Sequence, residues 1–227
     1  MAEQLHPEDI YQTLEHDIVT LKIKPGETIS ENQLCKRFGI SRTPVRAALQ
    51  RLEQNGFVQI IPCKGTIVTP INLDIVDQIA YQRTAVESMV LRDFIQVCSP
   101  KEYIENKYDL LEEMAQTMTD PENVDINAFL MLDLEMHAIW FRSMNKWYIW
   151  QSLTKPQPDY SRFTRLDVVR ANNVPDVLSE HREILRVIRE KDVDAIEPLI
   201  RHHLYGGLRR MGTQLYAEKY KSYFTGI

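Results

Sequence analysis

The chain has 227 residues, a hydrophobic fraction of 44% and a formal net charge of −5, which allow two folded domains and exclude a disordered chain. No apolar run reaches the roughly 18 residues of a membrane span, and the first residues do not form a signal peptide. Three widely spaced cysteines, Cys35, Cys63 and Cys98, exclude a disulfide framework and suit a cytoplasmic protein.

The first 40 residues predict two short helices and a turn. Apolar residues at helical spacing mark an amphipathic helix that ends at Lys24-Pro25-Gly26. Residues 30–38 form a second helix, and Gly39-Ile40-Ser41 then makes a tight turn. The pattern of helix, turn and following helix is that of a helix-turn-helix.

Residues 41–56 carry the most informative pattern of the chain. Ser41 stands at a capping position, Pro44 falls in the first turn, and Asn55-Gly56 stops the helix. One face of this helix is apolar: Val45, Ala48, Leu49 and Leu52. The remaining face is polar and basic: Arg42, Arg46, Gln50 and Arg51. Such a helix has the shape that enters a DNA major groove, although an ordinary solvated helix would show the same pattern.

A small β-hairpin is expected next. Residues 57–61 and 66–69 alternate as strands, and Pro62-Cys63-Lys64-Gly65 joins them with Lys64 at the tip. Six basic residues and only one acidic residue lie between Lys36 and Lys64. Three helices, a hairpin and this basic patch predict a winged helix-turn-helix that binds DNA. Because one small head makes few phosphate contacts, we expect two heads to act together.

The segment from Ile18 to Val68 resembles the DNA-binding head of the GntR family of bacterial transcription regulators. The resemblance rests on Pro25-Gly26-Glu27, Ser30-Glu31, the stretch from Ser41 to Leu52, and Lys64-Gly65-Thr66. It implies that Arg42 and Arg46 contact operator DNA, that Thr43 assists, and that the wing with Lys64 and Gly65 reaches the minor groove. Ala47 and Asn32 depart from the family pattern, and these departures bear on which operator is bound.

The rest of the chain is expected to be helical. Residues 69–72 form a short linker, which divides the chain into a DNA-binding domain, 1–72, and a second domain, 73–227. Prolines punctuate the expected helices, which span 74–97, 100–118, 124–144, 146–154, 160–172, 176–190 and 193–218. No segment after the linker alternates like a strand, so the fold is mainly α, with an all-α bundle after the winged head.

Four residues of this bundle point inward and could share one ligand: Asp133, His137, His181 and His203. Burial of an unpaired carboxylate costs several kcal/mol, and a buried imidazole needs partners. A single inward histidine is usually a satisfied core residue, but one divalent metal ion would satisfy all four groups together. Imidazole and carboxylate suit zinc best, with nickel or manganese as alternatives. His202, by contrast, points about 100° away from His203.

The second domain is similar to the ligand-sensing FCD domain of the FadR subgroup. The resemblance rests on Asp133 with His137 one turn later and Asn145 following, on Glu180-His181 before Ile184-Leu185, and on His203-Leu204. It implies one divalent metal per chain on Asp133, His137, His181 and His203. It also implies control by a small organic acid.

Arg83 is a further unusual residue. It lies within the apolar stripe of residues 74–97, where a guanidinium keeps its charge and needs an anion. The partner could be Glu87, in a salt bridge, or the carboxylate of an effector. Arg165 is a weaker second candidate for contact with the effector.

These features predict a homodimeric regulator that binds a pseudo-palindromic operator and responds to a small carboxylate. An enzyme is the first alternative, since a metal held by histidines and an aspartate also occurs in hydrolases. However, no His-Glu-x2-His motif is present and the winged head would be unexplained, so we expect no enzymatic activity. A regulator with a purely structural metal is the second alternative.

Overall fold

The computed structural model describes residues 6–97, 106, 109, 113, 126–155, 157–170 and 173–226. Two compact units divide the described residues. The first lies within Met1–Val76, Pro156–Leu166 and Gly212–Ile227, and the second within Asp77–Lys155 and Asp167–Met211. Both units are made of separate segments of the sequence, whereas the expected division at residue 72 gives two continuous domains. The division into a DNA-binding domain and a second domain stays a prediction.

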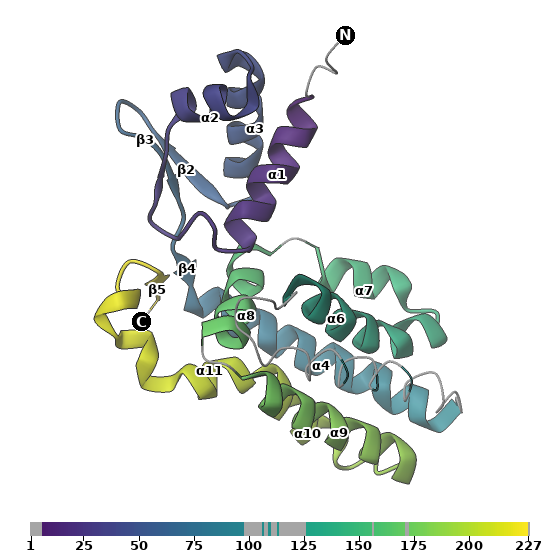
Figure 1. Cartoon of the computed structure of the whole chain (residues 1–227). Coiled ribbons are helices and arrows are strands. Elements are labelled where there is room, and N and C mark those ends of the chain that lie inside the picture. Colours follow the sequence, from purple (N-terminus) through teal and green to yellow (C-terminus); the bar gives the residue numbers. More distant parts are fainter. Residues whose placement is uncertain are drawn as a thin grey trace. The chain divides into compact units, whose positions relative to one another are not determined.

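The head within the first unit is built from three helices and a small sheet (Figure 1). Its elements are α1 (Pro7–Val19), β1 (Thr28–Ile29), α2 (Glu31–Phe38), α3 (Arg42–Gln54), β2 (Val58–Ile61) and β3 (Gly65–Val68). The expected hairpin is β2 paired antiparallel with β3, from Val58 opposite Val68 to Ile61 opposite Gly65. The structure adds β1, which pairs with the other edge of β3 and was not expected.

Helix α3 packs with the face that its sequence predicts. Its buried residues are Val45, Ala48, Leu49 and Leu52. They join apolar residues of α1, such as Leu14 and Ile18, in one hydrophobic cluster. Gly39 ends α2 with φ of 66°, which a glycine adopts without strain. Ser41 stands at the N-cap position of α3 as expected, but its hydroxyl makes no capping hydrogen bond.

The rest of the first unit surrounds the linker. Strand β4 (Ile71–Asn72) pairs in parallel with β5 (Phe224–Thr225). Helix α8 (Pro158–Arg170) begins in this unit, and its Arg162 is fully buried. The Nη1 of Arg162 donates to the carbonyl of Thr69 at 2.5 Å, its Nε donates to the carbonyl of Pro158 at 2.7 Å, and its Nη2 lies 3.5 Å from Asp159. Burial lowers the pKa of Arg162 to about 10, against the opposing effect of Asp159, so the side chain remains charged at neutral pH.

The second unit is helical in its described residues. Its helices are α4 (Leu73–Val97), which begins in the first unit, α6 (Ile126–Ser143), α7 (Trp147–Leu153), α9 (Val174–Glu190), α10 (Ile196–Leu204) and α11 (Gly206–Met211). Their apolar faces share one core that includes Phe94, Trp140, Ile184 and Ile200. The helix expected over 100–118 lies outside the described residues, apart from 106, 109 and 113.

The expected helix over 193–218 was wrong in its second half. Helix α10 ends at Leu204, and α11 ends at Met211. Two 3-10 helices follow, η1 (Gly212–Tyr216) and η2 (Glu218–Tyr220), and β5 comes after them. Gly212 adopts φ of 41°, which ends the α-helical backbone there. None of the described helices is both long and apolar enough to span a bilayer.

Candidate functional site

The polar face of α3 is exposed, as the sequence predicts. Arg42, Thr43, Arg46 and Gln50 all reach solvent. Arg42 donates to the side chain of Asn32 at 3.0 Å, and the Nε of Arg46 lies 3.0 Å from Glu31. Both partners belong to the start of α2, so the two arginines sit where the two helices of the motif meet.

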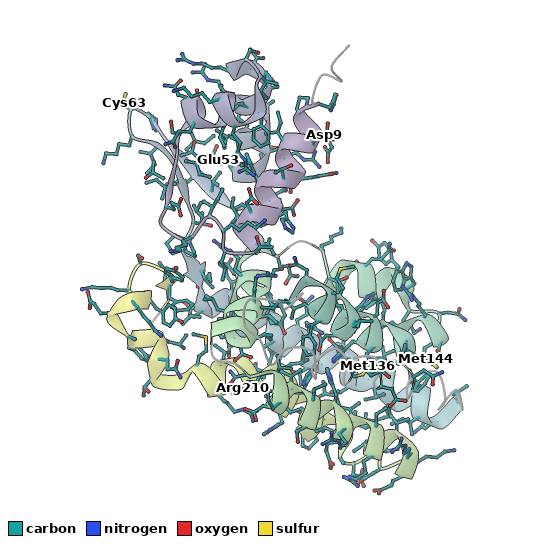
Figure 2. All side chains as sticks on the ribbon, viewed as in Figure 1. Asp9, Glu53, Cys63, Met136, Met144 and Arg210 are labelled. Carbon is teal, nitrogen blue, oxygen red and sulfur yellow. The ribbon has the colours of Figure 1, made fainter. Side chains whose placement is uncertain are left out.

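Arg51 and the wing complete the predicted DNA-binding residues. Arg51 is exposed, but it pairs with Glu8 of α1 and its guanidinium lies 4.1 Å from the centre of the Tyr11 ring. It therefore joins α3 to α1, unlike Arg42 and Arg46. Lys64 and Gly65 are exposed at the end of the hairpin, next to the outward-pointing Cys63 (Figure 2).

The four predicted metal ligands come together in the second unit. Asp133 and His137 lie on α6, His181 on α9 and His203 on α10. One ligand atom from each residue lies within 4.8 Å of the others. The one-turn spacing of Asp133 and His137 places both side chains on one face of α6. His137 and His181 are fully buried.

The distances between these atoms suit a small divalent cation. The Nε2 of His137 lies 3.2 Å from the Nε2 of His203 and 3.4 Å from the Nε2 of His181. The Nε2 of His181 lies 3.1 Å from a carboxylate oxygen of Asp133. Ligands about 2.0–2.1 Å from a tetrahedral zinc ion are separated by about 3.3 Å, so these three distances fit such an ion.

Two of the three histidines are oriented by buried carboxylates. The Nδ1 of His137 lies 2.7 Å from Glu87, and the Nδ1 of His203 lies 2.9 Å from Glu180. An ionised carboxylate only accepts hydrogen bonds, so each Nδ1 must carry the proton. In the neutral imidazole, each Nε2 then presents a lone pair.

This arrangement brings two lone pairs together. The Nε2 atoms of His137 and His203 face each other at 3.2 Å in a buried place. Burial lowers the pKa of His203 well below its usual value, and the neighbouring His181 and His137 lower it further. Protonation of His203 is therefore disfavoured and does not relieve the repulsion between the two lone pairs. A cation bound between the two nitrogens would replace their repulsion by two bonds. The donor set therefore fits a divalent metal ion.

Asp133 is held in the charged form that a metal requires. Burial raises the pKa of its carboxyl, but the hydrogen bond with His181 and the electrostatic effect of the neighbouring imidazoles outweigh burial and hold the pKa well below the usual range. Metal ligands must be deprotonated carboxylates and neutral imidazoles. Asp133 and His203 are both poised in the forms that bind a metal.

Arg83 forms a salt bridge with Glu87, one of the two partners that the sequence suggested. Its Nε donates to Glu87 at 2.6 Å, and the other oxygen of Glu87 reaches His137. Burial raises the pKa of Glu87, but Arg83 and His137 outweigh burial and hold it at about 2. The carboxylate of Glu87 thus connects Arg83 to His137, a predicted metal ligand. Arg165 belongs to the first unit, whereas the histidine cluster belongs to the second.

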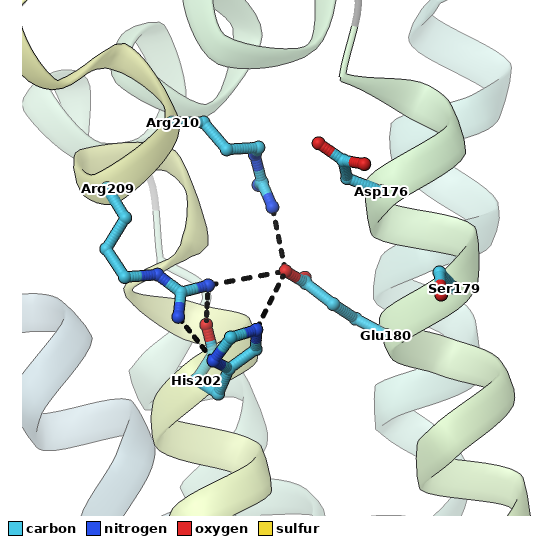
Figure 3. A pocket seen from close by; sticks show the side chains of 6 residues that line it. All are labelled: Asp176, Ser179, Glu180, His202, Arg209 and Arg210. Carbon is cyan, nitrogen blue, oxygen red and sulfur yellow. Dashed lines mark hydrogen bonds and ion pairs between the residues drawn. The ribbon is translucent and has the colours of Figure 1, made fainter.

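A pocket of about 350 Å³ lies beside Glu180. Its lining residues are Asp176, Ser179, Glu180, His202, Arg209 and Arg210 (Figure 3). His202 is exposed and points into this pocket, as its expected angle from His203 implies. The sequence did not indicate that Glu87 and Glu180 hold the histidines. Glu87 lies 50 residues from His137, and Glu180 is next to His181 in sequence but bonds to His203.

Comparisons with known proteins agree with a winged head followed by a helical domain. The family model described as bacterial regulatory proteins, gntR family, matches residues 7–68, and the FCD domain model matches residues 78–206. The HTH-type transcriptional repressor RspR of Escherichia coli K12 is 29% identical over 208 residues, which cover 88% of this chain and 89% of that protein. An uncharacterized HTH-type regulator of Streptomyces ambofaciens is 29% identical over 196 residues, covering 86% and 80%.

Two solved structures share the fold. A transcriptional regulator described as GntR from Rhodococcus sp. RHA1 has a TM-score of 0.67 at 18% identity and covers 91% of this chain and 97% of its own. McbR/YncC of E. coli has a TM-score of 0.64 at 16% identity, covering 96% and 100%. The named relatives are transcription regulators and not enzymes. The chain therefore belongs to the GntR family of bacterial transcription regulators, with an FCD domain following its winged head.

Proposed function

We propose that the protein is a homodimeric, cytoplasmic regulator of the FadR subgroup whose operator affinity is set by a small carboxylate at a metal centre. The metal would be one divalent ion per chain, zinc first, on Asp133, His137, His181 and His203. The observation that carries this proposal is the pair of facing Nε2 atoms of His137 and His203, 3.2 Å apart, on two rings whose Nδ1 atoms each contact a carboxylate.

The effector would bind beside this centre. A divalent ion with one aspartate ligand keeps one positive charge, and an expansion from four to five ligands would let it accept a carboxylate oxygen from the effector. Glu87 offsets the charge of Arg83, so Arg83 is not a free cation waiting for an anion. We propose that an effector carboxylate shares the guanidinium of Arg83 with Glu87, because the planar fork of an arginine can serve two acceptors.

The DNA-binding surface would comprise Arg42, Thr43, Arg46 and Gln50 of α3, with Lys64 and Gly65 of the wing. Arg42 and Arg46 would exchange Asn32 and Glu31 for DNA on binding, at little cost because both contacts are exposed. Two such heads in a dimer would match the two half-sites of a pseudo-palindromic operator. Arg51 would instead hold α3 to α1.

The change Arg46→Ala tests this surface. We expect operator binding to weaken by about 1–3 kcal/mol for each half-site, because one arginine contact with a base edge is lost. Affinity would be measured on DNA sites selected from a random pool with the wild-type protein. The matched control is Arg51→Ala on the same helix, which should keep most of the wild-type affinity. Equal losses in the two variants would contradict the proposed orientation of α3.

The change Arg83→Lys tests the effector site. Lysine keeps a positive charge opposite Glu87 but lacks the fork that two carboxylates could share. A panel of small mono- and dicarboxylates would first be screened for a rise in the melting temperature of the metal-loaded wild type. We expect Arg83→Lys to keep its metal and to lose most of that rise. An unchanged response would leave Arg83 with the structural role of holding Glu87.

A purely structural metal remains the second candidate, because the cluster is buried and lies in the core of a helical unit. It predicts that a chelator lowers the melting temperature and that no carboxylate in the panel raises it. The same screen therefore separates the two functions.

A further inference from the structure

Glu180 joins the histidine cluster to the surface pocket. One of its carboxylate oxygens, Oε2, lies 2.9 Å from the Nδ1 of His203. The other oxygen, Oε1, faces three nitrogen-bearing side chains on the pocket side, two guanidinium groups and one imidazole, and Figure 3 shows all three aimed at it. They are Arg210 at 2.9 Å, Arg209 at 3.5 Å and His202 at 3.8 Å. This carboxylate is almost buried, with 9% of its side chain exposed.

Arg210 is the best-anchored of these three side chains. Its Nη2 lies 2.6 Å from one oxygen of Asp167, and its Nε lies 3.3 Å from the other. Asp167 is buried on α8 and also accepts a hydrogen bond of 2.6 Å from Asn173. The guanidinium is thus fixed on two sides, by Asp167 and by Glu180.

Because Gly206 has no side chain, the guanidinium of Arg210 can lie directly against its backbone. A Cβ atom at Gly206 would lie 2.6 Å from Nη1 of Arg210 and 2.8 Å from Nη2. Any larger residue at this position would push the guanidinium away from its two carboxylates. The position therefore offers a way to move Arg210 without changing Arg210 itself.

The same arrangement occurs twice in the second unit. His137, Glu87 and Arg83 form a chain of imidazole, carboxylate and guanidinium, and His203, Glu180 and Arg210 form another. Each carboxylate places one oxygen on a histidine Nδ1 and the other on an arginine. Within the described residues, the Nδ1 of the third histidine, His181, has no hydrogen-bond partner.

We propose that Glu180 is a positioning residue for the metal centre, and that Arg210, anchored by Asp167, holds Glu180 in place. This inference rests on the proposed metal site. Glu180 fixes the Nδ1 proton of His203 and so directs its Nε2 toward the other ligands. Carboxylates in this position orient metal-bound histidines and raise their basicity.

The test measures the zinc affinity of the full chain by competition with a chelator. The change Glu180→Gln keeps the size of the side chain but removes the negative charge between His203 and Arg210. We expect zinc to bind about 10- to 100-fold more weakly. The matched control is Glu183→Gln, one turn along α9, where a half-exposed carboxylate pairs with Arg186. It should bind zinc like the wild type.

A second variant and a second measurement separate positioning from simple structural support. Gly206→Ala should weaken zinc binding in the same direction as Glu180→Gln, because it displaces Arg210. The Co²⁺ absorption spectrum, which reports the ligand arrangement, should change in both variants and not in Glu183→Gln. A lower melting temperature of the metal-free variants with unchanged zinc affinity would assign a structural role only and overturn the inference. Failure of the wild type to bind zinc, nickel or manganese would overturn the proposed function itself.

Discussion

His203→Ala should lose the metal and the stability that the metal supplies. The purified wild type is expected to hold about one divalent ion per chain, since four ligand atoms converge within 4.8 Å. An ion bound only by the folded state adds about 4 kcal/mol when its free concentration is 1,000 times the dissociation constant. Removal of His203 takes away one ligand and leaves Glu180 without its imidazole. Elemental analysis and thermal unfolding with and without added zinc would measure both effects.

His202→Ala is the matched control for this loss. The two histidines are neighbours on α10, but His202 is exposed in the surface pocket, where it contacts Arg209 and lies 3.8 Å from the outer oxygen of Glu180. It contributes no atom to the cluster of four candidate ligands. We expect the His202 variant to keep its metal and to respond to a chelator like the wild type. Undiminished metal in His203→Ala would refute the proposed set of ligands.

Arg162→Met should strongly destabilise the first unit. The side chain is fully buried and donates to the carbonyls of Thr69 and Pro158. Methionine fills a similar space but leaves both carbonyls without this donor and Asp159 without its nearby cation. Removal of one partner from a buried ionic network costs about 3–5 kcal/mol. The urea concentration at the midpoint of unfolding would report the loss.

Two further variants make this result specific. Arg162→Lys keeps the charge but has one ammonium group in place of a guanidinium that donates in three directions. The stability of this variant should therefore lie between that of Arg162→Met and that of the wild type. Lys221→Met removes an exposed cation of the same unit that pairs with Glu218, and it should change stability by less than about 1 kcal/mol. Equal midpoints for Arg162→Met and Lys221→Met would show that the buried contacts contribute nothing.

Local patterns in the sequence predicted the elements whose residues are close together. The apolar face of α3 was predicted residue by residue, because a helix repeats every 3.6 residues and its buried positions recur at that spacing. The four candidate ligands also come together as predicted, since each lies on the apolar face of its own helix. Their role as metal ligands stays a prediction.

The contacts that the sequence did not reveal are between distant segments. In the sequence, Arg162 looks like an arginine of a solvated helix. Only the fold shows that Thr69 lies beside it and accepts its hydrogen bond. Strands β1 and β5 have two residues each, too few to show alternation. The helix expected to reach residue 218 continued an apolar pattern past Gly206, Gly207 and Gly212, and glycine lowers the stability of a helix at each position.

The pairing of β4 with β5 has a consequence for the order of events during synthesis on the ribosome. All helices and strands of the winged head lie between Pro7 and Val68, so that head can fold as soon as it emerges. Ile71 and Asn72 cannot pair until Phe224 and Thr225 have been synthesised, about 150 residues later. At about 5–20 residues per second, the delay is roughly 8–30 s. During that time a nascent chain carries a finished DNA-binding head on a linker strand that still has no partner.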